Sequence, residues 1–193
     1  SSIDITTPEG LRDYAIMLLA FDTGLRSVDI RTLCLGDIDW NKGLLYLAQS
    51  KTGAPLILPL SGRVMNAIAD YILTGRPECS HDEIFLTVKG PVRPMNKRHG
   101  AFSSLCDKYF NAADVDKIPG RSFHSLRRSF ATELSEAGVP LETISQMPGH
   151  KSIGEDKPYL SYNREQIAFC AIGFDEIPVT HGIYAGGGRN DNK

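Results

Sequence analysis

The stretch SFHSLRRSFATEL, residues 122–134, has the pattern of a buried helix but carries basic side chains that such a helix does not need. Apolar residues at three- to four-residue spacing are typical of a helical face packed on a core. In this stretch they are Leu126, Phe130 and Leu134. His124 and Arg127 are three residues apart, so they also share a helical face. A hydrogen-bonded core histidine and an arginine reaching to solvent would explain the pair structurally, whereas an anion site would explain it functionally.

The composition is that of a globular protein. The chain has 193 residues, of which 41% are apolar and 23% are charged, and this length suits one compact domain. No apolar run approaches the ~20 residues of a membrane span, and no signal peptide opens the chain. We therefore expect a cytoplasmic protein with no membrane association. The expected domain covers residues 1–175, and residues 176–193 form a Gly-rich polar tail.

The cysteines do not form a metal-binding pattern. The four residues, Cys34, Cys79, Cys106 and Cys170, are widely spaced, and no pair has CxxC spacing. A chain of this size builds its own core and does not need disulfides. We expect reduced thiols and no metal.

The distribution of charge is more informative than its sum. The net charge of −2 counts mildly against a nucleic-acid partner. Residues 1–50 hold seven acids and four bases, whereas residues 87–100 and 117–128 hold bases and no acid. The basic residues of these two segments are Lys89, Arg93, Lys97 and Arg98, then Lys117, Arg121, Arg127 and Arg128. Because phosphate attraction depends on local charge, both segments are candidate DNA contacts, although two solvated basic loops explain them equally well.

The hydrophobic pattern predicts a mostly helical α+β fold with a small three-stranded antiparallel sheet. A helix is expected from residue 7 until Thr23-Gly24 breaks it, and a second, short one is expected to be capped by Ser27. Residues 37–61 predict the sheet, with turns at 41–43 and 51–53. The remaining helices are expected within 62–76, 99–115, 122–137, 140–147 and 163–171, and a strand or turn at 83–87.

Six polar residues lie where the local pattern does not require them. They are Arg26, Lys51, His124, Arg127, His150 and Tyr159. Each has an ordinary structural explanation alone, such as a surface arginine or a lysine in a turn. Together they can carry phosphoryl transfer without a metal, because two guanidinium groups can clamp a phosphodiester, lysine and histidine can move protons, and a tyrosine can attack phosphorus. The guanidinium pair then supplies the charge neutralisation of a divalent ion, and we expect no cofactor.

These residues stand in motifs that carry a resemblance. TGLRSVDI (23–30), SKTG (50–53), HSLRRSFAT (124–132), PGHKS (148–152) and KPYLSY (157–162) are similar to the motifs of the tyrosine recombinases, the phage-integrase family. That family has an arginine after TGL, a lysine in a β-hairpin, an HxxR helix, a GH pair and a tyrosine nine residues later. The six residues match in order and spacing, and Asp29 matches the acidic position that supports the site. The resemblance covers about residues 8–170 and implies the catalytic-domain fold of the family.

Two departures from the family pattern concern the last motifs. Pro148 stands where the family usually has leucine before the GH pair. Glu155, Asp156 and Pro158 precede the tyrosine in a stretch that is often threonine-rich in the family. Tyr162 is a rival nucleophile, and spacing favours Tyr159.

The resemblance implies a DNA strand-exchange reaction. Tyr159 would attack a phosphodiester and form a 3′-phosphotyrosyl link, Lys51 would protonate the leaving 5′ oxygen, and another 5′-hydroxyl would then attack the ester. Arg26 and Arg127 would stabilise the charge on phosphorus, with His124 and His150 assisting. Arg121 and Arg128 would contact flanking phosphates or solvent. We expect Arg26 and Arg127 to share one pocket.

The resemblance also implies partners and missing parts. Double-stranded DNA is the expected partner, with self-association into a tetrameric synapse in the full-length protein. An N-terminal core-binding domain of the family has no counterpart in this chain, which we interpret as the catalytic piece of an integrase from a phage or mobile element. Residues 163–184 are a candidate segment for docking on a neighbouring protomer, although packing on their own domain is equally consistent with the sequence.

Two other functions compete with this hypothesis. One is a type IB topoisomerase, which shares the chemistry but not the strand exchange. The other is a non-catalytic DNA-binding regulator, because residues 130–147 resemble a helix-turn-helix. The regulator hypothesis leaves Arg26, Lys51 and Tyr159 unexplained.

Overall fold

The computed structural model describes residues 3–48, 50, 53, 55–95, 100–114 and 122–140 of the chain. The first helix, α1, spans Pro8–Thr23. Thr7 caps it, because its Oγ1 accepts a hydrogen bond of 3.1 Å from the backbone N–H of Gly10. Gly24 ends it in the left-handed conformation, with φ of 62°, and donates its N–H to the carbonyl of Ala20. The predicted helix and its stop at Thr23-Gly24 are confirmed.

The second helix begins one step away from the predicted cap. Helix α2 spans Ser27–Arg31, and its N-cap is Arg26, whose backbone is extended. Ser27 is already helical, so the prediction that it caps the helix is wrong. Ile30 and Leu33 are buried, as the pattern predicted.

A single turn of 3₁₀ helix, η1 (Leu35–Asp37), leads into the sheet. Strands β1 (Ile38–Asp39), β2 (Leu44–Ala48) and β3 (Pro55–Pro59) pair antiparallel in the order β1-β2-β3. Leu45 lies opposite Ile38 on one side and Leu58 on the other, and all three are buried. The predicted three-stranded sheet is confirmed.

Helix α3 (Gly62–Asp70) continues as one wider turn, η2 (Tyr71–Gly75). Its N-cap Ser61 accepts from the N–H of Val64 and donates its hydroxyl to Asp22 at 2.8 Å, which ties the start of α3 to α1. Residues 84–86 are fully buried, and in place of the predicted strand or turn the segment 83–87 makes two isolated bridges, one from Glu83 to Cys34 and one from Leu86 to Pro94.

Helices α4 (Ala101–Ala112) and α5 (Phe123–Glu136) complete the described part. After α5, Gly138 has φ of 80°, as expected of a glycine that ends a helix. The helices predicted at 140–147 and 163–171 and the tail at 176–193 lie outside the described residues.

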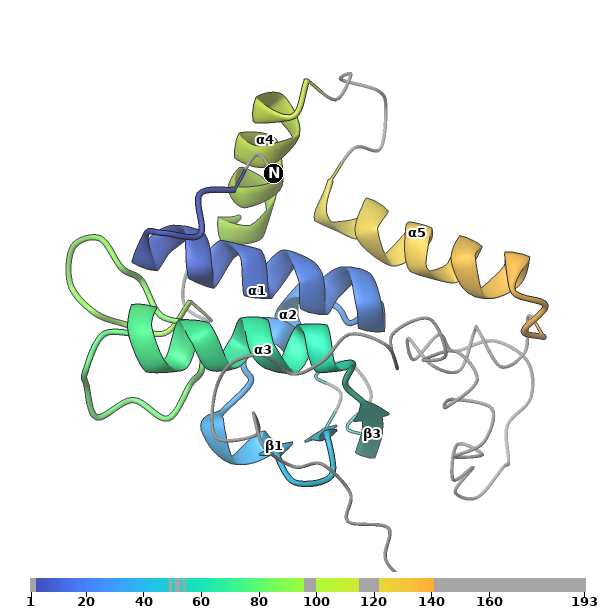
Figure 1. The fold of residues 1–193 in the computed structure, drawn as a ribbon, viewed down its shortest axis with the longest axis horizontal. Coiled ribbons are helices and arrows are strands. Elements are labelled where there is room, and N and C mark those ends of the chain that lie inside the picture. The colour runs from blue at the N-terminus through green and yellow to red at the C-terminus, as the bar shows by residue number, and fades with distance from the viewer. Residues whose placement is uncertain are drawn as a thin grey trace, which may run out of the picture.

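Helix α1 is at the centre of the arrangement (Figure 1). Helix α3 runs beside it, α5 packs near its C-terminal end, α4 stands over it, and the sheet lies beyond α3. The buried side chains of these elements form one main core, while Phe130 and Leu134 of α5 form a small cluster of their own. The mostly helical α+β class is confirmed. In the described part of the chain, no helix is both long enough and apolar enough to cross a bilayer.

Candidate functional site

The end of α1 is shaped by a close approach of α5. Gly24 has a positive φ, and a Cβ placed on it would lie 2.4 Å from Cδ1 of Phe130. The phenyl ring of α5 therefore lies directly against the backbone at residue 24. Only glycine satisfies both the left-handed turn and this contact. The TGL motif thus brings the end of α1 to the HxxR helix.

Arg127 of α5 also contacts the end of α1 at Gly24. Its side chain is buried, with the residue 5% exposed. Its Nη1 donates a hydrogen bond of 2.8 Å to the carbonyl oxygen of Gly24. Such a bond satisfies a backbone acceptor that the helix end leaves open. It also fixes the guanidinium beside Arg26, which follows two residues after Gly24.

Arg26 and Arg127 are electrostatic neighbours. Burial first, and then the positive charge of Arg26, lower the pKa of Arg127 to about 10, against the opposing effect of Asp29. At neutral pH Arg127 therefore keeps its charge. Nη1 of Arg26 is itself buried. Two guanidinium groups that act on one another in this way are suited to bind an anion, because each presents donors in a fixed planar fork.

Asp29 links this pair to the β2–β3 hairpin. The residue is 3% exposed, and its Oδ1 accepts a hydrogen bond of 2.8 Å from the backbone N–H of Ser50. Ser50 immediately precedes Lys51, which lies outside the described residues. The contact places the start of the hairpin turn next to α2, and therefore next to Arg26.

His124 lies one helical turn before Arg127. Its side chain is exposed on the surface. Loss of hydration first, and then the charges of Arg127, Arg128 and Arg26, lower the pKa of His124 below its usual value of 6.5. The imidazole is therefore neutral at pH 7 and can accept as well as donate a hydrogen bond.

The structure brings four of the predicted site residues to the junction of α1, α2 and α5: Arg26, Asp29, His124 and Arg127. The other predicted catalytic residues, Lys51, His150 and Tyr159, and the rival Tyr162 lie outside the described residues. Their roles stay predictions. Among the described residues, no group of three His, Cys, Asp or Glu side chains is placed to hold a metal. Cys34, Cys79 and Cys106 are free thiols.

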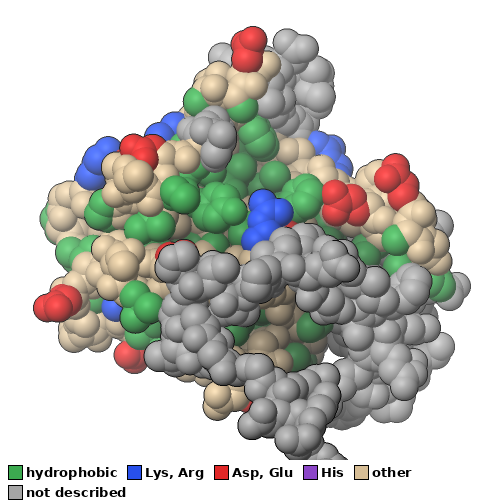
Figure 2. Space-filling model, in the orientation of Figure 1, with side chains coloured by type: hydrophobic (Ala, Val, Ile, Leu, Met, Phe, Trp, Pro, Cys, Tyr) green, Lys and Arg blue, Asp and Glu red, His purple; other side chains and the backbone are tan. Residues whose placement is uncertain are grey.

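The predicted DNA-contact residues are only partly described. Lys89 forms an ion pair with Glu9, and Arg93 and Arg128 are exposed. Lys97, Arg98, Lys117 and Arg121 lie outside the described residues. On the face seen in Figure 2, the Lys and Arg side chains of the described residues stand in separate groups.

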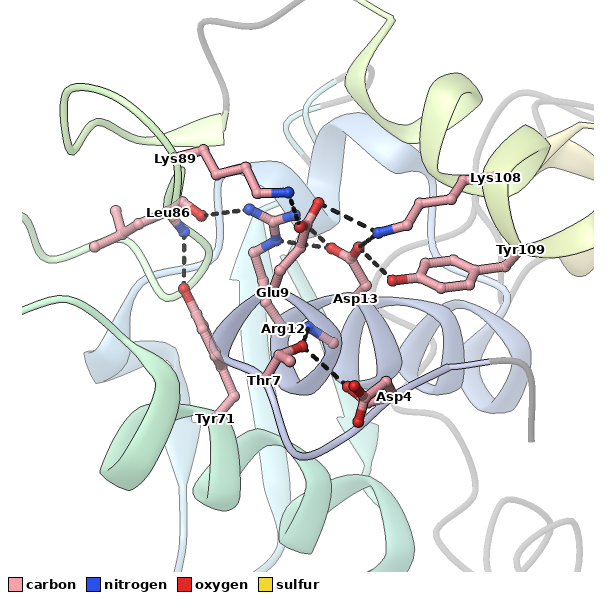
Figure 3. A network of polar contacts seen from close by, with 11 residues as sticks. Asp4, Thr7, Glu9, Arg12, Asp13, Tyr71, Leu86, Lys89, Lys108 and Tyr109 are labelled. Carbon is pink, nitrogen blue, oxygen red and sulfur yellow. Dashed lines mark hydrogen bonds and ion pairs between the residues drawn. The ribbon is translucent and has the colours of Figure 1, made fainter. Parts of the chain in front are cut away.

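Sequence reasoning missed the backbone partners of the site and a buried polar network on α1. The carbonyl of Gly24 and the N–H of Ser50 carry no side-chain signal. The network joins Arg12 and Asp13 to Tyr109 and Lys108 of α4 and to the carbonyl of Leu86 (Figure 3). Its signal was present, because two adjacent charges interrupt the apolar face of the helix beside Ala15 and Ile16.

Comparison with known proteins agrees with the motifs and the fold. The model of the phage integrase family matches residues 2–166. The chain is 37% identical to y4gC of Sinorhizobium fredii, whose name describes it as an integrase or recombinase, over 90% of this chain and 87% of that protein. It is 29% identical to the tyrosine recombinase XerD of Ralstonia nicotianae, over 85% of this chain and 53% of XerD.

Solved structures show the same fold. The recombinase XerH bound to its difH substrate superposes with a TM-score of 0.64 at 20% identity, over 78% of this chain and 42% of XerH. The integrase of mycobacterium phage Brujita superposes with a TM-score of 0.62 at 24% identity, over 86% of this chain and 52% of that integrase. The chain thus spans about half the length of XerD and of these two structures.

These relatives are named integrases and recombinases, which does not favour the topoisomerase or regulator alternatives. With its TGLR turn, its HxxR helix and this fold, the chain belongs to the phage integrase family, which includes the tyrosine recombinases.

Proposed function

We propose that this chain is the catalytic domain of a site-specific DNA recombinase that cleaves and rejoins strands through a 3′-phosphotyrosyl intermediate. The observation that carries the proposal is the junction of α1 and α5, where Gly24 and Phe130 bring Arg26 and Arg127 together. Two neighbouring guanidinium groups and a neutral histidine are suited to bind one phosphodiester. The DNA partner is supported by the XerH structure, which is described as bound to its difH substrate.

The reaction begins with the attack of a phenol oxygen on phosphorus. Tyr159 forms a bond to the phosphorus of the scissile phosphodiester, and the bond to the 5′ oxygen breaks. Lys51 gives its proton to that oxygen, which leaves as a 5′-hydroxyl. Rejoining reverses the exchange with a 5′-hydroxyl of another strand, so one ester replaces another and no external energy source is consumed.

Arg26 and Arg127 stabilise the transition state. Negative charge grows on the two non-bridging oxygens as phosphorus becomes pentacovalent, and preorganised charged donors lower the barrier most where charge develops. Arg127 is preorganised by its bond to Gly24, which fixes the plane of its guanidinium beside the position proposed for the phosphate. His124, neutral at pH 7, is placed to receive the phenol proton or to hydrogen-bond a phosphate oxygen, with His150 as the second histidine.

Residues 1–175 form the catalytic domain in this proposal, and a synapse of several protomers would form in a longer protein. The proposal on self-association rests on the family alone.

Trapping of the covalent intermediate tests the proposal. The chain is incubated with a pool of nicked duplexes with randomised arms, and protein–DNA adducts that survive denaturant are digested and mapped by mass spectrometry. The expected result is a nucleotide on Tyr159, with loss of the adduct in Tyr159→Phe and its retention in Tyr162→Phe. An adduct on Tyr162, or none with any duplex in the pool, would reject the assignment.

A further inference from the structure

A carboxylate on α1 bridges two lysines from other parts of the chain. Oε2 of Glu9 lies 2.5 Å from Nζ of Lys89, and Oε1 lies 3.3 Å from Nζ of Lys108. Lys89 belongs to the segment after the buried residues 84–86, and Lys108 belongs to α4. The two ammonium groups reach Glu9 from different sides, one to each oxygen (Figure 3).

The two lysines differ in how they are held. Lys108 lies 3.6 Å from the buried carboxylate of Asp13 and over the ring of Tyr109, so it stays in place without Glu9. The side chain of Lys89 is 81% exposed, and Glu9 is its ion-pair partner among the described residues. The ion-pair partner of Lys89 is therefore exchangeable, because exposed pairs contribute only about 0–1 kcal/mol.

A phosphodiester can take the place of the Glu9 carboxylate. Both groups carry one negative charge on two equivalent oxygens, and both accept charge-assisted hydrogen bonds from ammonium groups. Lys89, Lys108 and Arg12, set against Glu9 and Asp13, give this group of side chains a net charge of +1, which becomes +2 when Glu9 is removed. The site therefore attracts a second anion even while Glu9 occupies it.

The bridge lies at the opposite end of α1 from Gly24. Glu9 and Thr23 are 14 residues apart on the helix, which corresponds to about 21 Å. At 3.4 Å per base pair, this length corresponds to about six base pairs of a duplex laid parallel to α1. Lys89 also opens the basic segment 87–100.

We propose that Lys89 and Lys108 form a contact with the DNA backbone about six base pairs from the cleaved phosphate, and that Glu9 occupies this contact until a phosphate displaces it. This inference rests on the proposed function. Glu9 then acts as an internal competitor that weakens DNA binding, and a merely structural role of the bridge would not have this effect.

Binding of a fluorescent mixed-sequence duplex, followed by anisotropy over a series of salt concentrations, tests the inference. Glu9→Gln removes the competing charge, and Glu78→Gln is the matched control, because Glu78 is exposed and lies outside the bridge. We expect Glu9→Gln to bind the duplex about fourfold more tightly than Glu78→Gln, as one charge about 5 Å from a phosphate in water would produce. Lys89→Met with Lys108→Met keeps the aliphatic stems and should lower the slope of log K against log salt by about 0.9 per lysine.

A double-mutant cycle separates competition for the lysines from a general effect of charge. Added to the Lys89→Met, Lys108→Met chain, Glu9→Gln should bind no more tightly than Glu78→Gln on the same background. Equal affinities of Glu9→Gln and Glu78→Gln, with the wild-type chain bound, would overturn this inference alone, and so would a gain that persists without the lysines. Absence of any binding by the wild-type chain at low salt would overturn the proposed function with it.

Discussion

Nη1 of Arg127 donates a 2.8 Å hydrogen bond to the carbonyl oxygen of Gly24, across 103 residues of sequence. This bond joins the HxxR helix to the TGLR turn. The bond orients the guanidinium of Arg127. The turn places the second guanidinium, that of Arg26, two residues after Gly24. The helix end would otherwise leave this buried acceptor without a partner, so the bond serves the fold as well as the proposed chemistry.

Replacing Arg127 with lysine should separate charge from geometry. Arg127→Lys keeps a positive charge but loses the planar fork that bonds Gly24 and, in the proposed function, a phosphate. We expect the rate of covalent adduct formation to fall by about 10²–10³. Single-turnover adduct formation measures the rate, and the exposed Arg128→Lys is the matched control. Equal rates for the two variants would contradict the role proposed for Arg127.

Gly24 should be intolerant of a side chain for two separable reasons. Gly24→Ala suffers the strain of a positive φ, about 1–2 kcal/mol, and a clash of its Cβ with Phe130. Gly90→Ala is the matched control, because Gly90 has φ of 77° and nothing within 4 Å of its added Cβ. We expect Gly24→Ala to lower the free energy of unfolding by about 1–3 kcal/mol more than Gly90→Ala does.

Urea denaturation measures both variants. Adding Phe130→Leu should recover part of the loss in Gly24→Ala, since the smaller side chain gives room to the new methyl group. If Gly24→Ala and Gly90→Ala lose the same stability, α5 does not press on residue 24 as the structure describes.

Much of this fold follows from local pattern. The helix at 8–23 and its stop at Gly24 were predicted because apolar spacing and a glycine stop are local signals. The hairpin strands were predicted for the same reason, from two turns between apolar runs. The N-cap of α2 was predicted wrongly. Arg26 has the extended backbone of an N-cap while Ser27 is helical, and composition does not determine this difference.

The convergence of the site needed information beyond local pattern. No spacing rule brings residue 127 to residue 24, and the resemblance supplied that expectation. Two backbone groups hold the site together: the Gly24 carbonyl, which accepts, and the Ser50 N–H, which donates. Neither has a signature in the side-chain sequence. The Glu9 bridge was also missed, because Lys89 and Lys108 are each 80 or more residues from Glu9 in the sequence.

Asp29 should matter for the hairpin that carries Lys51. Asp29→Ala removes the 2.8 Å acceptor of the Ser50 N–H and should cost about 0.5–1.5 kcal/mol of stability, because Ser50 is exposed and water can replace part of the bond. Asp29→Asn keeps an oxygen acceptor and should lose less. Because Lys51 is the next residue after Ser50, we expect Asp29→Ala to slow adduct formation more than it weakens DNA binding.

Chemical denaturation measures the loss of stability in Asp29→Ala and in Asp29→Asn. Single-turnover adduct formation measures the loss of rate in the same two variants. An Asp29→Ala chain with wild-type stability and wild-type rate would show that the Ser50 contact positions nothing.

The protonation of His124 should respond to its cationic neighbours in a predictable direction. Loss of hydration, Arg127, Arg128 and Arg26 all lower the pKa of His124 because each disfavours the imidazolium. Arg128→Gln removes one exposed charge and leaves Arg26 and Arg127 intact, so the pKa of His124 should rise. The neutral form is the one that accepts a proton from the attacking phenol, so the acid limb of adduct formation should lie below pH 6.5 in the wild type and move upward in Arg128→Gln.

NMR titration of the imidazole Cε1–H signal, assigned through His124→Asn, follows the pKa directly, and Arg31→Gln on α2 is the charge-matched control. A pKa of His124 at or above 6.5 in the wild-type chain, or one unmoved by Arg128→Gln, would remove the electrostatic argument for a neutral histidine at this site.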